Sequence, residues 1–124
     1  MYAFMPKYKT LREVLIDQNL AALGDAYANF IYSLALSEKR GEPTGAKVDN
    51  RILSQALKKA GLRETLPKRT PRHKQADAAE ALIVYAWMLN AVTIHEGVKI
   101  LEGSKDMVEA FSSLLLEARE KLAL

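Results

Sequence analysis

Residues 75–83 read Gln-Ala-Asp-Ala-Ala-Glu-Ala-Leu-Ile, and they set Asp77 and Glu80 three positions apart at the start of an almost wholly apolar segment. Residues three apart share one face of a helix, so both carboxylates point the same way. The only strongly polar residue from 81 to 92 is Asn90. A helix that is apolar on all sides is buried on most of them. The pattern predicts a central helix whose two acids either cap its N-terminus or hold a cation.

The rest of the chain also has helical periodicity. A stripe at spacings of three and four predicts a first long helix with an apolar face formed by Leu20, Leu23, Tyr27, Phe30, Ile31 and Leu34. Glycine and proline at 41–45 indicate a loop, and short and long helices are expected over about 51–60 and 105–122. The central helix is expected to run from about Lys74 towards Gly97. Because no segment alternates as a strand does, we predict an all-α fold in a single domain over residues 1–124.

The composition excludes several classes of protein. The 124 residues include no cysteine, which excludes a disulfide framework, a thiolate nucleophile and a zinc–sulfur site. The hydrophobic share of 49% argues against disorder. No apolar run reaches the roughly 18 residues of a membrane span, and the first residues lack the apolar core of a signal peptide. We therefore expect a cytoplasmic protein that does not bind membranes.

The positive charge is concentrated in one segment. Residues 58–74 contain seven Lys or Arg and a single acid, although the net charge of the whole chain is only +3. Prolines at 67 and 71 keep the segment out of helix until about residue 74. A positive patch beside a carboxylate pair suits a polyanion drawn to a metal site, although a solvated basic loop is the simpler interpretation. The candidates for phosphate contacts are Lys68, Arg69, Arg72, His73 and Lys74.

A third acid, Asp25, lies almost opposite the apolar stripe of the first long helix and among small residues. The preceding Gly24 costs roughly 1 kcal/mol in a helix interior relative to alanine. Such a cost is tolerated where another element comes close to the backbone. The pattern indicates either a carboxylate aimed into that contact or ordinary helix packing.

The order of five short motifs resembles that of the ribonuclease III catalytic domain across most of the chain. They are Leu-Gly-Asp-Ala at 23–26, Gly-Glu-Pro-Thr at 41–44, Asn-Arg at 50–51, Gly-Leu at 61–62 and Ala-Asp-Ala-Ala-Glu-Ala-Leu-Ile at 76–83. Arg72-His73 ahead of Glu80 is also similar to the Mini-III branch. The nearest match is an archaeal single-domain ribonuclease III-like family. This resemblance implies a ribonuclease III endonuclease-domain-like helical bundle.

The resemblance also implies an activity, a cofactor and partners. Asp25, Asp77 and Glu80 match the family's ligands for Mg²⁺ or Mn²⁺, and Asp25 and Glu80 are the expected catalytic residues. The expected substrate is double-stranded or structured RNA, hydrolysed at its phosphodiesters. Ribonuclease III domains act as symmetric dimers, so a homodimer is expected.

One departure from the family pattern keeps a second interpretation open. The family usually has glutamates seven and four residues before its aspartate, whereas this chain has Gln18 and Ala21. The Mini-III branch also lacks these glutamates and a double-stranded-RNA-binding domain. Without such a domain, we expect RNA affinity to be modest and sensitive to salt. The alternative is a catalytically lapsed dimer that binds structured RNA as a scaffold.

Overall fold

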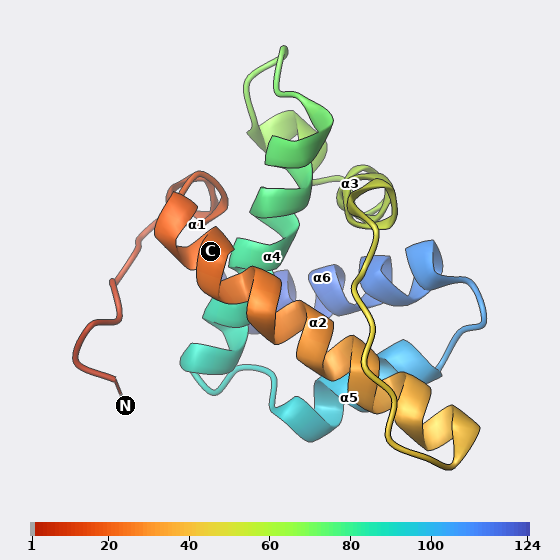
Figure 1. Ribbon diagram of the computed structural model, residues 1–124. Coiled ribbons are helices and arrows are strands. Elements are labelled where there is room, and N and C mark those ends of the chain that lie inside the picture. Colours follow the sequence, from red (N-terminus) through yellow and green to blue (C-terminus); the bar gives the residue numbers. More distant parts are fainter. Residues whose placement is uncertain (1) are drawn as a thin grey trace.

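A computed structural model describes residues 2–124, and within this range the chain forms six α-helices, one 3-10 turn and no strand (Figure 1). The all-α prediction is confirmed. None of the helices in the described range is both long and apolar enough to cross a membrane. The elements are α1 (Leu11–Leu15), α2 (Gln18–Arg40), α3 (Asn50–Lys59), η1 (Arg63–Thr65), α4 (Arg72–Met88), α5 (Ile94–Glu102) and α6 (Met107–Leu122).

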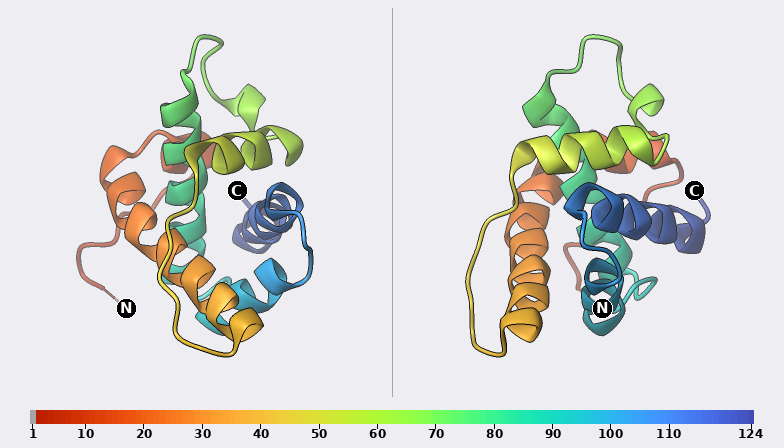
Figure 2. Two further views of the ribbon diagram at one scale, coloured as in Figure 1. Left: turned by 45° about the vertical axis from the view of Figure 1, so that its right-hand side comes forward. Right: turned by 90° about the vertical axis from the view of Figure 1, so that its right-hand side faces the viewer.

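Helix α4 is the centre of the structure, as its apolar sequence predicts. It packs against α1, α2, α3 and α6, and Figures 1 and 2 show the other helices arranged around it. Every residue from Ala78 to Ala86 is buried, because neighbouring helices cover all sides of this stretch. Only the first turns of α4 extend beyond these neighbours towards solvent.

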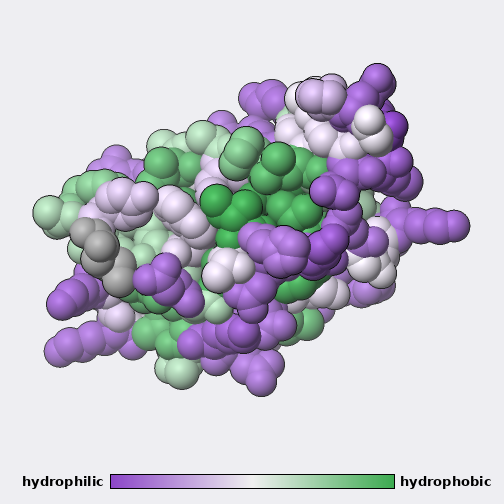
Figure 3. All heavy atoms as spheres, turned by 90° about the horizontal axis from the view of Figure 1, so that it is seen from below, coloured by the Kyte–Doolittle hydropathy of each residue, from purple (hydrophilic) through white to green (hydrophobic). Residues whose placement is uncertain are grey.

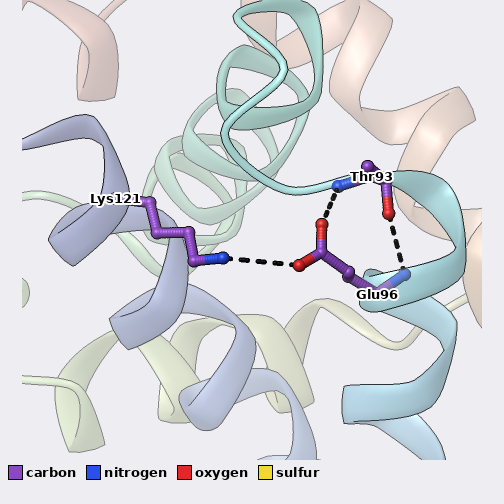
Figure 4. A network of polar contacts seen from close by, with 3 residues as sticks. All are labelled: Thr93, Glu96 and Lys121. Atoms are coloured by element: carbon purple, nitrogen blue, oxygen red, sulfur yellow. Dashed lines mark hydrogen bonds and ion pairs between the residues drawn. The ribbon is translucent and has the colours of Figure 1, made fainter.

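The prediction that the central helix continues towards Gly97 is wrong. Helix α4 ends at Met88, and Asn90 has a left-handed backbone with φ of 60°. Thr93 then begins α5: its side chain accepts from the Glu96 N–H, and the Glu96 carboxylate accepts from the Thr93 N–H (Figure 4). This Thr-x-x-Glu capping box was the available sequence signal. The capping box is hard to recognise in the sequence, because apolar residues that pack in the core continue on both sides of the break.

The apolar stripe predicted for the first long helix is not its main buried face. Leu20 and Ile31 are buried, but Leu23 and Phe30 are 40% and 53% exposed. The buried face consists mainly of smaller residues, namely Leu20, Ala21, Gly24, Ala28, Ile31 and Ala35. Small side chains allow α4 to come close, which the larger residues of the stripe would prevent.

Polar residues four positions apart on α2 hold the segment that follows it. The Ser37 hydroxyl accepts from the Thr44 N–H at 2.8 Å, and the Ser33 hydroxyl accepts from the Ala46 N–H at 2.9 Å. The Asn29 side-chain oxygen accepts from the Val48 N–H at 2.7 Å. Residues 42–49 therefore run back along α2 towards its N-terminal half, as Figure 2 shows. This return path brings the start of α3 beside α4.

Candidate functional site

The site begins where α2 and α4 cross at very close range. A Cβ added to Gly24 would lie 2.1 Å from the carbonyl oxygen of Glu80 and 2.5 Å from its carbonyl carbon. No side chain fits there, so the glycine permits a backbone contact that alanine would block. Asp25 follows Gly24 directly, and the crossing therefore sets its carboxylate beside that of Glu80. The sequence prediction that another element approaches this glycine is confirmed.

A hollow of about 740 Å³ opens at this crossing and contains all three predicted acids. Asp25 is exposed and Asp77 half-buried, whereas Glu80 is only 4% exposed. The wall opposite α4 comes from the end of the return segment and the start of α3. The lining residues are Gln18, Ala21, Ala22, Asp25, Lys47, Val48, Asp49, Asn50, Asp77 and Glu80.

The capping interpretation of Asp77 and Glu80 is excluded by where α4 begins. The helix starts at Arg72 after Pro71, and no side chain caps it. At 3.6 residues per turn, Asp77 lies in the second turn and Glu80 in the third. Neither carboxylate can therefore serve the unpaired N–H groups of the first turn. Both instead belong to the hollow.

Glu80 has an unusual protonation equilibrium. Its pKa is raised to about 8, mainly by burial and then by the neighbouring Asp25, through a hydrogen bond and its charge. Asp77 acts in the same direction, while the Lys47 ammonium partly opposes the rise. Carboxylates crowd one another in this way when no cation lies between them. A cation bound in the hollow would therefore reduce the repulsion between Glu80 and the neighbouring carboxylates.

Two residues that shape the hollow, Asn29 and Lys47, are not among the predicted site residues. Asn29 donates from its side-chain nitrogen to Asp25 Oδ1 at 3.1 Å while accepting from the Val48 N–H. It therefore orients the Asp25 carboxylate and ties it to the return segment. Lys47, on that segment, supplies a positive charge inside the hollow. The sequence signal for Asn29 is its position four residues after Asp25 on the same helix. No pattern in the sequence near Lys47 indicates its place in the hollow.

The end of the hollow nearest the N-terminus of α4 carries an amide and an ammonium group. Lys74 Nζ donates to Gln18 Oε1 at 2.9 Å, joining the first turns of α4 and α2. Gln18 stands where the family usually has a glutamate, and the methyl group of Ala21 occupies the other such position. This end of the hollow therefore has a neutral amide and a bound lysine ammonium in place of a carboxylate, so it carries less negative charge.

The predicted phosphate-binding residues gather at the same end of α4. Lys68, Arg69, Arg72 and His73 are exposed, and Lys74 is half-buried. The loop between η1 and α4 projects at the top of Figure 1. Helix α4 begins two residues earlier than predicted, because Pro71 is compatible with the position before a first turn.

This basic loop is held in one conformation by side chains that bond its backbone. The Arg63 guanidinium donates to the carbonyl oxygens of Pro67 and Lys68. The Thr70 hydroxyl donates to the Pro67 carbonyl oxygen at 2.6 Å, and the Gln75 side chain donates to the Thr70 carbonyl oxygen at 2.9 Å. The positive side chains are therefore presented on a preorganised backbone.

The donors in the hollow fit a hard cation that keeps much of its water. Mg²⁺ is commonly bound by one or two carboxylates together with substrate phosphate, and Asp25 and Glu80 form such a pair. Within residues 2–124, however, no three acidic or histidine side chains are grouped closely enough to hold a metal ion together. The predicted role of Asp77 as a third ligand stays a prediction.

Comparison with known proteins agrees with the motif order. The family model described as Ribonuclease III matches residues 18–122, from the first residue of α2 to the last of α6. A search of curated proteins found no match. The matched region contains the carboxylate hollow and the whole basic loop.

Proposed function

The chain belongs to the ribonuclease III family, and we propose that it is a metal-dependent endoribonuclease acting on phosphodiesters of double-stranded or structured RNA. Membership of this family supports cleavage of RNA in general. The observation that carries the finer proposal is the buried Glu80 carboxyl beside Asp25, in a hollow whose Gln18 is hydrogen-bonded to Lys74 at the basic end of α4.

Each residue of the hollow has a role in this proposal. Asp25 and Glu80 would hold Mg²⁺ or Mn²⁺, with Asp77 as a further ligand or as an acceptor for the ion's water molecules. When bound, the ion supplies Lewis acidity at the phosphodiester and activates water. Asn29 keeps the Asp25 carboxylate oriented by the 3.1 Å hydrogen bond. Lys47 attracts the phosphate into a hollow that otherwise carries acids.

The basic loop would position the RNA without reading its sequence. Duplex RNA is recognised mainly by its shape and backbone, and phosphate contacts set register and orientation. Lys68, Arg69, Arg72 and His73 provide such contacts at the end of α4 nearest the carboxylates. Because each phosphate contact releases counterions, binding should weaken steeply as salt rises.

We also propose that the protein acts as a homodimer, supported by the apolar residues that the fold leaves uncovered. Leu23 and Phe30 of α2 are 40% and 53% exposed. Tyr27 of the same stripe stacks on Trp87 at 5.1 Å between ring centroids, and Tyr2 lies 5.9 Å from that ring. Figure 3 shows a broad apolar area on one face of the molecule. Large apolar patches of this kind mark contact surfaces.

The dimer is tested by molar mass in solution. Phe30→Ser should weaken self-association, whereas Leu116→Ser, at an equally exposed leucine of α6 (46%), should leave it unchanged. A wild-type protein that stays monomeric at the highest attainable concentration would contradict the proposal.

A second candidate function is binding of structured RNA without cleavage. Two observations favour it: the absence, within residues 2–124, of three grouped ligands, and the presence of Gln18 and Ala21 at the usual glutamate positions. In this case the basic loop would still contact RNA phosphates, and the carboxylate hollow would no longer take part in catalysis.

Cleavage of a labelled RNA duplex separates the two functions. Wild type, Asp25→Asn and Glu80→Gln are compared with Mg²⁺ or Mn²⁺ present, and the new ends are mapped on both strands. Glu38→Gln is the matched control, because Glu38 is an exposed acid of α2 about 20 Å along the axis from Asp25. The enzyme reading requires metal-dependent cuts that are lost in both site variants and kept in the control. Duplex binding without cutting in any metal would support the scaffold instead.

A further inference from the structure

A second hollow of about 340 Å³ adjoins the carboxylate hollow at Gln18, which lines both. It lies between the C-terminal end of α1, the basic loop and the first turn of α4. The hydrogen bond from Lys74 to Gln18 forms the boundary between the two hollows. The family match begins at residue 18, so the α1 side of this second hollow lies outside the matched region.

The second hollow is lined mainly by apolar residues, together with two cationic side chains. Leu15, Ile16, Leu66 and Pro71 contribute the apolar surface, and Arg69 and Lys74 contribute the charges. Ile16 is half exposed at the opening. An apolar recess beneath two cations is complementary to a ligand with one flat, weakly polar part and one anionic part.

Hydrogen bonds from the side chains of Arg63, Thr70 and Gln75 to backbone carbonyl oxygens hold the loop that forms one side of the recess. A preformed recess loses little conformational entropy when a ligand enters. Its volume lies within the range of sites for small molecules.

The second hollow is close enough to the carboxylates to bind a nucleotide of the RNA strand whose phosphodiester lies at the carboxylates. Gln18 and Asp25 are seven residues apart on α2, about 10 Å along the helix axis. A few nucleotides of one RNA strand cover a distance of this size. A paired base cannot enter the recess, since its faces are stacked within the duplex; an unpaired base can leave the stack and present a face to apolar walls.

We infer that the second hollow binds one unpaired nucleotide of the RNA, with its base against Leu15, Ile16 and Pro71 and its phosphate against Arg69 and Lys74. This inference rests on the proposed RNA substrate, and it narrows the substrate class to structured RNA with a bulged or unpaired nucleotide a few nucleotides from the cut bond. Gln18 and Lys74 then serve as the partition between the base and the carboxylates.

The test uses short RNA duplexes with one bulged nucleotide at the centre, and the same duplexes with that nucleotide made abasic. Binding to the wild-type protein is measured in EDTA, so that no cleavage interferes. Stacking of one base is worth about 1–3 kcal/mol, so the base-containing bulge should bind about 5- to 150-fold more tightly than the abasic one. Equal affinities would overturn the inference.

Two variants locate the effect. Ile16→Asn should reduce the difference between the two duplexes towards unity, while Leu116→Asn, an equally exposed residue on α6, should preserve it. A difference that survives Ile16→Asn unchanged would place the base elsewhere and overturn the assignment. Both variants are checked by thermal melting, and neither replaces a core residue.

Failure of this inference is distinguishable from failure of the proposed activity. A protein that prefers the base-containing bulge but cuts no RNA in Mg²⁺ or Mn²⁺ would keep the nucleotide site and refute the enzyme. A protein that cuts both duplexes equally, and binds them equally, would keep the enzyme and refute the nucleotide site.

Discussion

Replacing Gly24 by alanine should destabilise the protein, although alanine is the better helix former. The added Cβ would lie 2.1 Å from the Glu80 carbonyl oxygen, and a normal carbon–oxygen contact is longer by about 1.2–1.5 Å. The obstructing atoms belong to helix backbone, so no side-chain rotation can relieve the clash. Helices α2 and α4 must move apart, which exposes part of their buried interface.

The magnitude follows from two opposing effects. Alanine gains about 1 kcal/mol over glycine from helix propensity, while forcing extra volume into a packed contact costs about 1–3 kcal/mol and sometimes more. A backbone collision places this case at the upper end, so the free energy of unfolding should fall by about 2 kcal/mol. For a chain of this length the melting temperature should drop by about 8 °C.

Gly97→Ala is the matched control, because it makes the same chemical change inside another helix. A Cβ at Gly97 would meet Ile31 Cδ1 at 3.6 Å and Leu114 Cδ1 at 4.0 Å, which are ordinary contacts. This variant should be as stable as wild type, or more stable by up to about 1 kcal/mol. Urea unfolding of the three proteins gives both differences.

The same variant should alter the site. If the helices separate, water reaches the Glu80 carboxyl and its pKa falls from about 8 towards the ordinary value. The reasoning fails if Gly24→Ala matches or exceeds the stability of Gly97→Ala. That result would mean that the two backbones are not in contact at this crossing.

Three further changes test other parts of the structure. The folded pKa of Glu80 is raised from the ordinary 4.5 to about 8, so the stability that this carboxyl contributes is full below pH 4.5 and lost as pH rises through about 8. Thermal melts in EDTA at about pH 5.5 and 8.5 should therefore show a loss of stability in wild type that Glu80→Gln removes. An equal loss in the variant would exclude Glu80 as its source. Tyr85→Phe removes the hydroxyl that accepts from the Tyr8 N–H at 3.0 Å. The free energy of unfolding, measured in urea, should fall by about 1 kcal/mol. Unchanged stability would mean that water replaces the hydroxyl as the partner of this N–H. Thr93→Ala removes the hydroxyl that caps the Glu96 N–H and should lower the free energy of unfolding by about 1 kcal/mol. Amide hydrogen exchange should become faster only at the start of α5. Faster exchange throughout the protein would argue against a local capping role.

Local sequence patterns were sufficient to predict the buried central helix and the shared helix face of two of its carboxylates. An apolar stretch with no polar face has only one stable location, the middle of the fold, and residues 78–86 are buried accordingly. Asp77 and Glu80 share a helix face because of their spacing alone. The cost of glycine within a helix likewise indicated close approach at Gly24 before any partner was known.

Patterns within one segment misled where burial depends on another segment. The large residues of α2 form a stripe, but α4 selects the narrower face with Gly24 and Ala28, because close helix crossing needs small side chains. The end of α4 at Met88 was hidden for a similar reason: apolar residues continue through the break, since both sides face the same core.

The sequence by itself determined the helical class, the buried central helix and the shared helix face of Asp77 and Glu80, because these depend on periodicity and spacing within single segments. Only the tertiary structure decided what surrounds the acids. It made Glu80 a buried carboxyl rather than a helix cap and placed Lys47 in the same hollow. It also linked Asp25, through Asn29, to Val48, which lies nineteen residues beyond Asn29 in the chain. The physical reason is that a charged group's protonation and orientation depend on desolvation and on through-space neighbours, and these are set by how the helices cross.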